Sequence, residues 1–140
     1  MTLVEVLAVV VILGLIATTL TLSFRGQMGR AKRELARTGI GVIVNAIEAY
    51  AIETGDLPTM EDGLAVLTRP VGGRAEPLLK SDKLVDPWGH PYLYVTPGPV
   101  STYQVLSYGS DGRLGGEARS DEADLTSDDL GDRAAGTNAP

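Results

Sequence analysis

The sequence predicts an α+β protein in which one long amino-terminal α-helix packs against a small antiparallel β-sheet. Three observations predict this fold class. Residues 1–24 form an almost wholly apolar run, residues 25–54 keep a helical period of apolar positions, and residues 55–130 alternate turn residues with short strand-like segments. The apolar half of the helix is expected to protrude, because a head this small cannot enclose a rod of about 80 Å at 1.5 Å per residue.

The first segment, residues 1–24, carries a single charged side chain, that of Glu5. About 20 apolar residues are needed to cross the hydrocarbon core of a bilayer, so this segment is predicted to be a membrane span, at least transiently. A carboxylate among apolar side chains is costly in hydrocarbon. Two interpretations of Glu5 are open: it snorkels at the membrane face, or it pairs with a specific positive partner.

The second segment, residues 25–54, is predicted to be the amphipathic half of the same helix. It is expected to end near Gly55, ahead of Pro58. Apolar side chains recur at intervals of three and four residues, which predicts one buried face. These side chains are Ala36, Ile40, Ile43, Ile47 and Tyr50.

A basic cluster follows the apolar run, although the net charge of the chain is −6. The cluster can lie against anionic lipid headgroups or mark the cytoplasmic flank of the span. It can also form a solvated helix face with charged neighbours three and four residues apart. Nucleic acid is not an expected partner, because acidic residues crowd the carboxyl-terminal third. The cluster consists of Arg25, Arg30, Lys32, Arg33 and Arg37.

The head, residues 55–130, is predicted to contain a short helix started by Thr59 and two strands, at residues 92–95 and 103–107. A tight turn formed by Asp86, Pro87, Trp88 and Gly89 precedes the first strand. Trp88 is expected to be a buried corner of the core rather than a ligand-stacking residue. His90, the only histidine, is expected to be a surface turn residue. The chain has no cysteine and therefore no disulfide.

Acidic residues and glycines alternate near the carboxyl end, in VLSYGSDGRLGGEARSDEADL. Asp111 lies in a glycine-rich turn, and Asp121, Glu122 and Asp124 follow it. Carboxylates together with exposed carbonyl groups are what a calcium ion needs, with six to eight oxygens at about 2.3 to 2.6 Å. The alternative is an acidic solvated tail. Residues 131–140 are small, polar and unpatterned, and are expected to be disordered.

The string MTLVEVLAVVVILGLIA resembles the first helix of type IV pilins and of type II secretion pseudopilins, in which mature chains begin with an apolar residue followed by TLxE. The resemblance implies that Met1 is a processed and N-methylated amino terminus made by a prepilin peptidase. It also implies that Glu5 pairs with the amino group of a neighbouring subunit as subunits leave membrane lipid for a helical filament. Where this family often has proline, the chain has Leu22.

Two internal segments, GDLPTMEDGLAVL and DPWGHPYLY, narrow the resemblance to the major pseudopilins of type II secretion. The carboxyl-terminal loop resembles their calcium-binding motif SxGxDGxxGG, which is followed by acids. The resemblance implies that Ca²⁺ is bound by side chains of Asp111, Asp124 and one or both of Asp121 and Glu122, with main-chain oxygens near Tyr108 and Arg113. The residues that fall on these motifs are Gly55, Pro58, Thr59, Gly63, Leu64, Leu67, Asp86, Pro87, Trp88, Gly89, Tyr92, Ser107, Gly109, Asp111, Gly112, Gly115, Gly116, Asp124 and Leu125.

The resemblance implies a pilin-like structural subunit and not an enzyme. Such a chain is a single-pass protein of the bacterial inner membrane with its head in the periplasm. It forms a homo-oligomeric filament with minor pseudopilins and an inner-membrane assembly platform, and the filament drives protein export.

Two alternatives remain at this stage. One is a type IV pilin-like subunit for adhesion or motility, a class that usually carries a carboxyl-terminal disulfide, whereas this chain has no cysteine. The other is a membrane-anchored, calcium-dependent binding module. Enzymatic function finds little support, because the sequence shows no serine, histidine and acid arrangement and no phosphate-binding loop.

Overall fold

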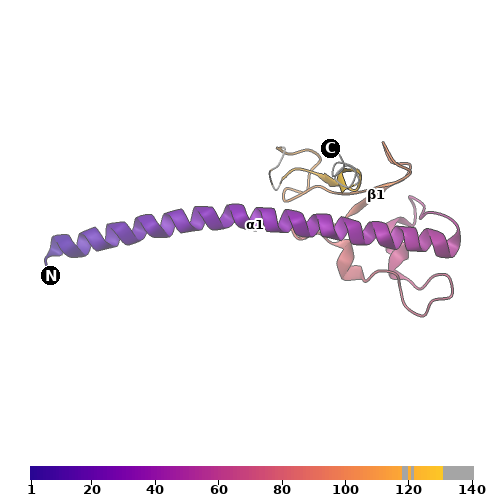
Figure 1. Ribbon diagram of the computed structural model, residues 1–140, viewed down its shortest axis with the longest axis horizontal. Coiled ribbons are helices and arrows are strands. Elements are labelled where there is room, and N and C mark those ends of the chain that lie inside the picture. Colours follow the sequence, from indigo (N-terminus) through magenta and orange to yellow (C-terminus); the bar gives the residue numbers. More distant parts are fainter. Residues whose placement is uncertain (118–119, 121, 131–140) are drawn as a thin grey trace, which may run out of the picture. The chain divides into compact units, whose positions relative to one another are not determined.

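The computed structural model describes residues 1–117, 120 and 122–130, except for the side chains of residues 21–25 (Figure 1). Asp121 and the segment 131–140, which is predicted to be disordered, lie outside the described residues. The chain divides into two compact units, Met1–Ala31 and Lys32–Pro140. The described elements are α1 (Leu3–Thr54), which runs through both units, the 3-10 helices η1 (Gly63–Thr68) and η2 (Ser81–Leu84), and the strands β1 (Leu93–Val95), β2 (Gln104–Ser107) and β3 (Leu125–Thr126).

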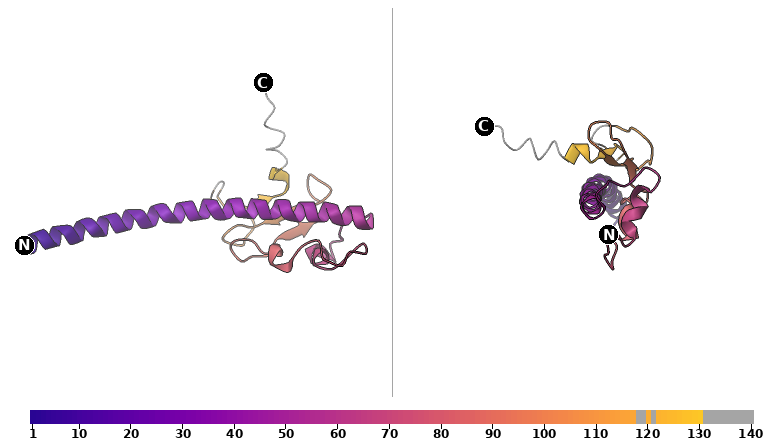
Figure 2. Two further views of the ribbon diagram at one scale, coloured as in Figure 1. Left: turned by 60° about the horizontal axis from the view of Figure 1, so that its bottom comes forward. Right: turned by 90° about the vertical axis from the view of Figure 1, so that its right-hand side faces the viewer.

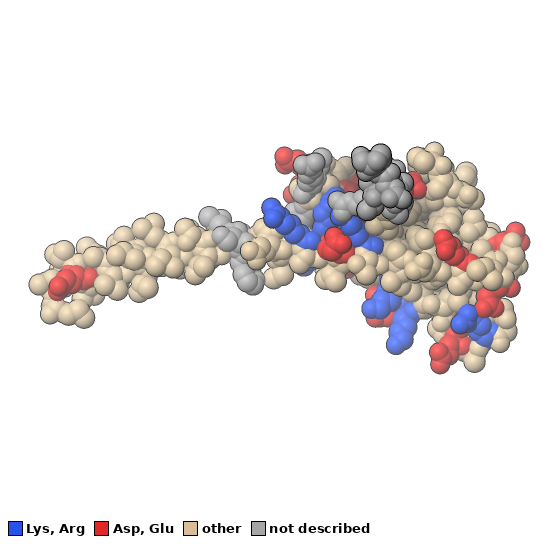
Figure 3. All heavy atoms as spheres, in the orientation of Figure 1, with Lys and Arg blue, Asp and Glu red and all other residues tan. Residues whose placement is uncertain are grey.

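In the first unit, every side chain from Met1 to Leu20 is exposed. The stretch Leu3–Leu20 is long and apolar enough to cross a membrane, and none of it is buried. Glu5 is the only charged residue in this stretch, and Figure 3 shows red acidic atoms near its free end on an otherwise tan surface. A helix whose whole circumference is apolar is stable in lipid or in an assembly, and not as a surface in contact with water.

In the second unit, the predicted helical stripe forms the core. Ala36, Ile40, Ile43 and Ile47 are all 0% exposed, and Tyr50 packs against them. Burying an aliphatic side chain of this size contributes about 1.5 to 3 kcal/mol relative to leaving it exposed. This stripe therefore contributes several kcal/mol to the stability of the head, which has no cysteine. The other core residues are Ala46, Leu64, Leu67, Leu79, Tyr92, Tyr94, Val105 and Leu125.

The sheet has three antiparallel strands in the order β1-β2-β3. Leu93 pairs with Leu106, and Ser107 pairs with Leu125. Figure 2 shows the strands and connecting loops gathered along the second part of α1. The predicted fold class, a long apolar helix with a small antiparallel sheet, is confirmed. The two predicted strands each begin one residue later than expected, and β3 was not predicted.

The short helix expected to start at Thr59 is a turn followed by the 3-10 helix η1. The Thr59 Oγ1 atom accepts a hydrogen bond from the Asp62 amide at 3.1 Å and donates to the Asp62 carboxylate at 2.7 Å. Gly63 then adopts a φ of 56°. The positive φ at Gly63 separates the turn at residues 59–62 from the helical residues that follow, and η1 begins at Gly63 rather than at Thr59.

Tyr92 packs against α1 at Gly39, where the absence of a side chain leaves room for its ring. Its hydroxyl donates to the Ala36 carbonyl at 3.2 Å, and a Cβ atom added at Gly39 would lie 2.9 Å from the Tyr92 Cζ atom. Burial raises the pKa of Tyr92 to about 12, and the Asp86 carboxylate adds to this rise. The buried tyrosine therefore stays neutral and remains a donor throughout the physiological pH range.

Replacing Gly39 by alanine is expected to lower the free energy of unfolding by about 1 to 3 kcal/mol, the usual range for overpacking a core. Gly41 is the matched control, because a Cβ atom added there meets nothing within 4 Å. Alanine at Gly41 is expected to be neutral or to stabilise the helix by up to about 1 kcal/mol. Urea unfolding of the full chain in detergent measures both, and equal effects at the two glycines would contradict this packing.

Candidate functional site

Glu5 takes part in a local hydrogen-bonded motif at the start of α1. The amide and the hydroxyl of Thr2 donate to Glu5 Oε2 at 2.7 and 3.1 Å, and the Glu5 amide donates to Thr2 Oγ1 at 3.3 Å. This reciprocal arrangement is a capping box, which satisfies amides that have no partner within the helix. Sequence reasoning missed this role, although Thr-x-x-Glu before an apolar run is its signature.

The capping box leaves the negative charge of Glu5 without an opposite charge. Within the residues that the structure describes, Glu5 forms no ion pair, and both hydrogen bonds that its side chain accepts come from Thr2. Met1 and Glu5 are both exposed. Such a carboxylate can accept further hydrogen bonds from a group outside the chain.

At the carboxyl end, the predicted metal ligands are distributed around a loop between β2 and β3. Asp124 is tied to Gly115 by two hydrogen bonds: the Gly115 amide donates to Asp124 Oδ2 at 2.9 Å, and the Asp124 amide donates to the Gly115 carbonyl at 3.2 Å. Asp124 Oδ1 is buried and, within the described part of the chain, has no hydrogen-bond partner. Among the described residues, no group donates a hydrogen bond to this buried carboxylate oxygen.

The other predicted ligands are less enclosed. Asp111, Arg113 and Glu122 are exposed, and Tyr108 is half-buried. Asp111 Oδ1 accepts the Arg113 amide at 3.1 Å, which closes a tight turn. Among the described residues, no three acidic or histidine side chains come close enough together to hold a metal ion. The structure therefore brings Asp124 and the glycine-rich turn together, and the acids that it describes, Asp111, Glu122 and Asp124, do not form one cluster.

Arg33 braces this loop from the helix. Its Nη1 atom donates to the carbonyl groups of Ser120 and Ala123, at 2.7 and 2.9 Å. The sequence interpretations placed Arg33 with the lipid-facing or solvated charges of the basic cluster. The structure corrects these interpretations, because Arg33 binds the loop instead. A guanidinium has several donors in a planar fork and can bind two carbonyl oxygens. The sequence around Arg33 contains no pattern that predicts a contact with Ser120, which is 87 residues away.

The turn formed by Asp86, Pro87, Trp88 and Gly89 is organised around one buried carboxylate. Asp86 is 5% exposed. Its Oδ1 atom accepts the amides of Trp88 and His90 at 3.0 and 2.8 Å, and its Oδ2 atom accepts the Ser107 hydroxyl at 2.7 Å. Trp88 packs against the core as a partly buried corner. His90, expected on the surface, is half-buried, and its Nδ1 atom lies 3.0 Å from the Gly109 carbonyl oxygen.

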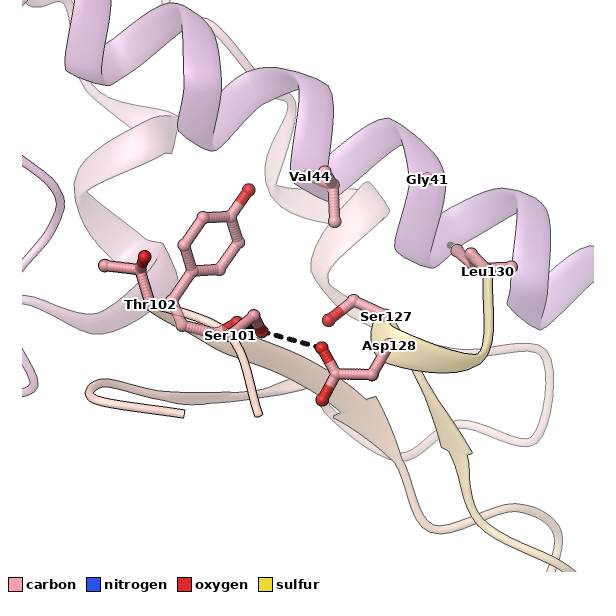
Figure 4. Close-up of a pocket in the computed structure, with 8 residues that line it drawn as sticks. Gly41, Val44, Ser101, Thr102, Ser127, Asp128 and Leu130 are labelled. Atoms are coloured by element: carbon pink, nitrogen blue, oxygen red, sulfur yellow. Dashed lines mark hydrogen bonds between the residues drawn. The ribbon is translucent and has the colours of Figure 1, made fainter. Parts of the chain in front are cut away.

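A cavity of about 430 Å³ opens in the second unit between α1 and the segments that flank β2 and follow β3 (Figure 4). Asp128 is the acidic residue that lines it. Its Oδ1 atom accepts the Ser101 hydroxyl and its Oδ2 atom accepts the Gln104 amide, both at 2.6 Å. These contacts tie the β1–β2 connection to the chain after β3. The described residues that line the cavity include no histidine, lysine or arginine.

These features define a class of protein. The chain is a pilin-like subunit, in which an exposed apolar helix continues into the core helix of a small antiparallel head. The stretch Leu3–Leu20 is long and apolar enough to anchor such a subunit in a membrane.

Comparison with known proteins identifies the family. Residues 23–128 match the family model "Type II secretion system (T2SS), protein G". The type II secretion system core protein G of Vibrio cholerae is 36% identical over 126 residues, covering 83% of each chain, and that of Xanthomonas campestris is 36% identical over 120 residues, covering 84% of this chain and 82% of the relative. The chain belongs to the type II secretion system protein G family.

A solved structure shares the fold. The crystal structure of the major pseudopilin from the type 2 secretion system of enterohaemorrhagic Escherichia coli matches with a TM-score of 0.61 and 24% identity, covering 82% of this chain and 93% of that chain. Membership of the protein G family supports the secretion-system interpretation over the adhesion pilin and the anchored binding module.

Proposed function

We propose that this chain is the structural subunit of a type II secretion pseudopilus, which polymerises from the inner membrane into a periplasmic filament that drives protein export. The observation that carries this proposal is the wholly exposed apolar stretch Leu3–Leu20 in a member of the protein G family. Only lipid or other apolar helices provide surroundings in which this surface is stable. A pseudopilus subunit has both surroundings in turn: its apolar helix lies in lipid before assembly and against the helices of other copies in the filament.

Assembly is proposed to depend on Glu5. In the apolar centre of a filament, an unpaired carboxylate is strongly destabilising, whereas a hydrogen-bonded opposite charge offsets much of the cost of burial. The capping box leaves the charge of Glu5 uncompensated within the described residues, so the amino group of a neighbouring subunit is a fitting partner. Processing by a prepilin peptidase and methylation of the Met1 nitrogen belong to the same proposal.

A calcium ion is proposed to bind the loop between β2 and β3. Its support is Asp124 Oδ1, a buried oxygen with no donor among the described residues. Leaving such a group unsatisfied costs about 1 to 3 kcal/mol, and more when it is charged. Asp124 would hold the ion, with Asp111, Asp121 or Glu122 and main-chain oxygens near Tyr108 and Arg113 completing the ligands.

When bound, calcium supplies positive charge that pins the final loop to the sheet. The Gly115 amide already bonds to Asp124 within this loop, and the Arg33 guanidinium holds the loop from α1. An ion that binds only the folded head stabilises it by linkage. In a chain without cysteine, it would take the place of a disulfide as the clamp on the carboxyl-terminal segment.

The partners proposed for the filament are further copies of the chain, minor pseudopilins and an inner-membrane assembly platform. Removing this chain from its host is expected to stop export, so that secreted enzymes accumulate in the periplasm. Supplying the wild-type chain in trans is expected to restore export. Immunoblots of medium and periplasm measure both, and unchanged export without the chain would overturn the proposal.

A further inference from the structure

We propose that two sets of groups position the glycine-rich turn for calcium binding: the buried Asp86–Ser107 pair orients the Tyr108 carbonyl, and the His90 ring holds the following peptide at Gly109. This inference rests on the proposed calcium site and adds residues that do not themselves ligate the ion. Asp86 and Ser107 are 5% and 0% exposed, and they connect two parts of the chain 21 residues apart. Their contacts converge on Gly109, at the beginning of the glycine-rich turn.

The first step is the direction of the Ser107 hydroxyl. A hydroxyl has one proton to donate. Ser107 Oγ gives that proton to Asp86 Oδ2 at 2.7 Å, so its oxygen accepts the Gly109 amide at 3.3 Å. Asp86 cannot move freely, because its other oxygen accepts the Trp88 and His90 amides. The rigid turn at Asp86 therefore holds the Gly109 amide through one side chain.

The second step is the peptide that joins Tyr108 to Gly109. A trans peptide is planar, and its N–H and C=O groups point in opposite directions. Because Ser107 fixes the N–H of Gly109, it also fixes the direction of the Tyr108 carbonyl, which is one of the proposed main-chain ligands. The φ of 72° at Gly109 allows the chain to turn at this point, a conformation in which glycine has no steric penalty.

The third step is the following peptide, which His90 holds. A carbonyl oxygen can only accept, so the His90 Nδ1 atom carries the proton and donates to the Gly109 carbonyl at 3.0 Å. The same ring packs against Gly112, where an added Cβ atom would lie 2.9 Å from Nε2. His90 therefore contacts the chain on both sides of Asp111. Groups that hold metal ligands in place typically contribute 10- to 100-fold to metal affinity.

Isothermal titration of calcium chloride into the full chain in detergent micelles tests this inference. H90A is expected to raise the calcium dissociation constant about tenfold. H90N is expected to keep an affinity within about twofold of wild type, because its amide nitrogen can occupy the place of Nδ1 and donate to the Gly109 carbonyl. H90Q, whose amide lies one carbon further out, is expected to behave like H90A.

A purely structural role of His90 would lower the melting temperature without calcium and leave the dissociation constant of the folded protein unchanged. That result would overturn the inference while leaving the calcium site intact. Equal weakening in H90A and H90N would also overturn it, because the donor would then not matter. S107A is the second test and is expected to weaken calcium at least as much as H90A. A wild-type chain that binds no calcium would overturn the calcium site and this inference together.

Discussion

Replacing Glu5 by alanine is expected to give a chain that stays in the membrane and forms no filaments. The span keeps its length and becomes more apolar, so insertion is retained. Assembly fails because the amino group of the neighbouring subunit would enter the apolar filament centre without a counter-charge, a cost of about 3 to 5 kcal/mol for each subunit contact. Membrane fractionation and electron microscopy of sheared filaments measure the two parts of this prediction.

The capping box allows the two roles of Glu5 to be separated. Glutamine at this position preserves a capping box, because its side-chain oxygen can accept the Thr2 amide. E5Q therefore removes the charge and keeps the helix start, whereas T2V removes a capping partner and keeps the charge. We expect E5Q to fail in assembly as E5A does. Normal filaments from E5Q would show that the carboxylate acts only as a cap, and the proposed pairing would be wrong.

Calcium is expected to raise the melting temperature of the wild-type head and to leave that of an Asp124→Asn variant unchanged. At a calcium concentration of about 100 times the dissociation constant, linkage adds about 2.7 kcal/mol. For a domain of this size, each kcal/mol raises the melting temperature by about 4 to 8 °C. Differential scanning calorimetry of the full chain in detergent, with calcium and with a chelator, measures the difference.

The matched control for Asp124 is Glu76, which is exposed and far from the loop in sequence. E76Q removes the same charge and is expected to retain the whole calcium effect. Asparagine at Asp124 keeps an oxygen that can accept the Gly115 amide, so the variant is expected to fold without calcium. An identical calcium response in the wild type and the Asp124 variant would remove Asp124 from the metal site.

The helix and its buried face could be predicted from the sequence because they depend on local order. A period of three and four residues is visible over residues 25–54, and the structure buries Ala36, Ile40, Ile43 and Ile47 completely. Gly55 follows the last helical residue with a φ of 87°, as a residue that ends a helix often does. The boundaries of the predicted segments at residues 24, 54 and 130 stay predictions.

What could not be predicted depends on contacts between distant residues. Strand β3 has only two residues, too few for any alternation to be visible. Arg33 binds carbonyl groups 87 and 90 residues away. The pairing of Asp86 with Ser107 could be predicted only if the register of β2 relative to the turn at Asp86 were known. Of the proposed metal site, the sequence indicates the acids and the glycines, but it does not indicate that Asp124 Oδ1 alone is buried without a donor in the described residues.

The most direct test of the proposed function is electron cryomicroscopy of the chain expressed with its assembly machinery. The proposal predicts a helical filament with residues 1–24 of every subunit at its centre. It also predicts a Glu5 carboxylate within about 4 Å of the amino-terminal nitrogen of a neighbouring subunit, the usual limit for an ion pair. A chain that stays monomeric in water without detergent, with its first helix dissolved, would contradict the proposal.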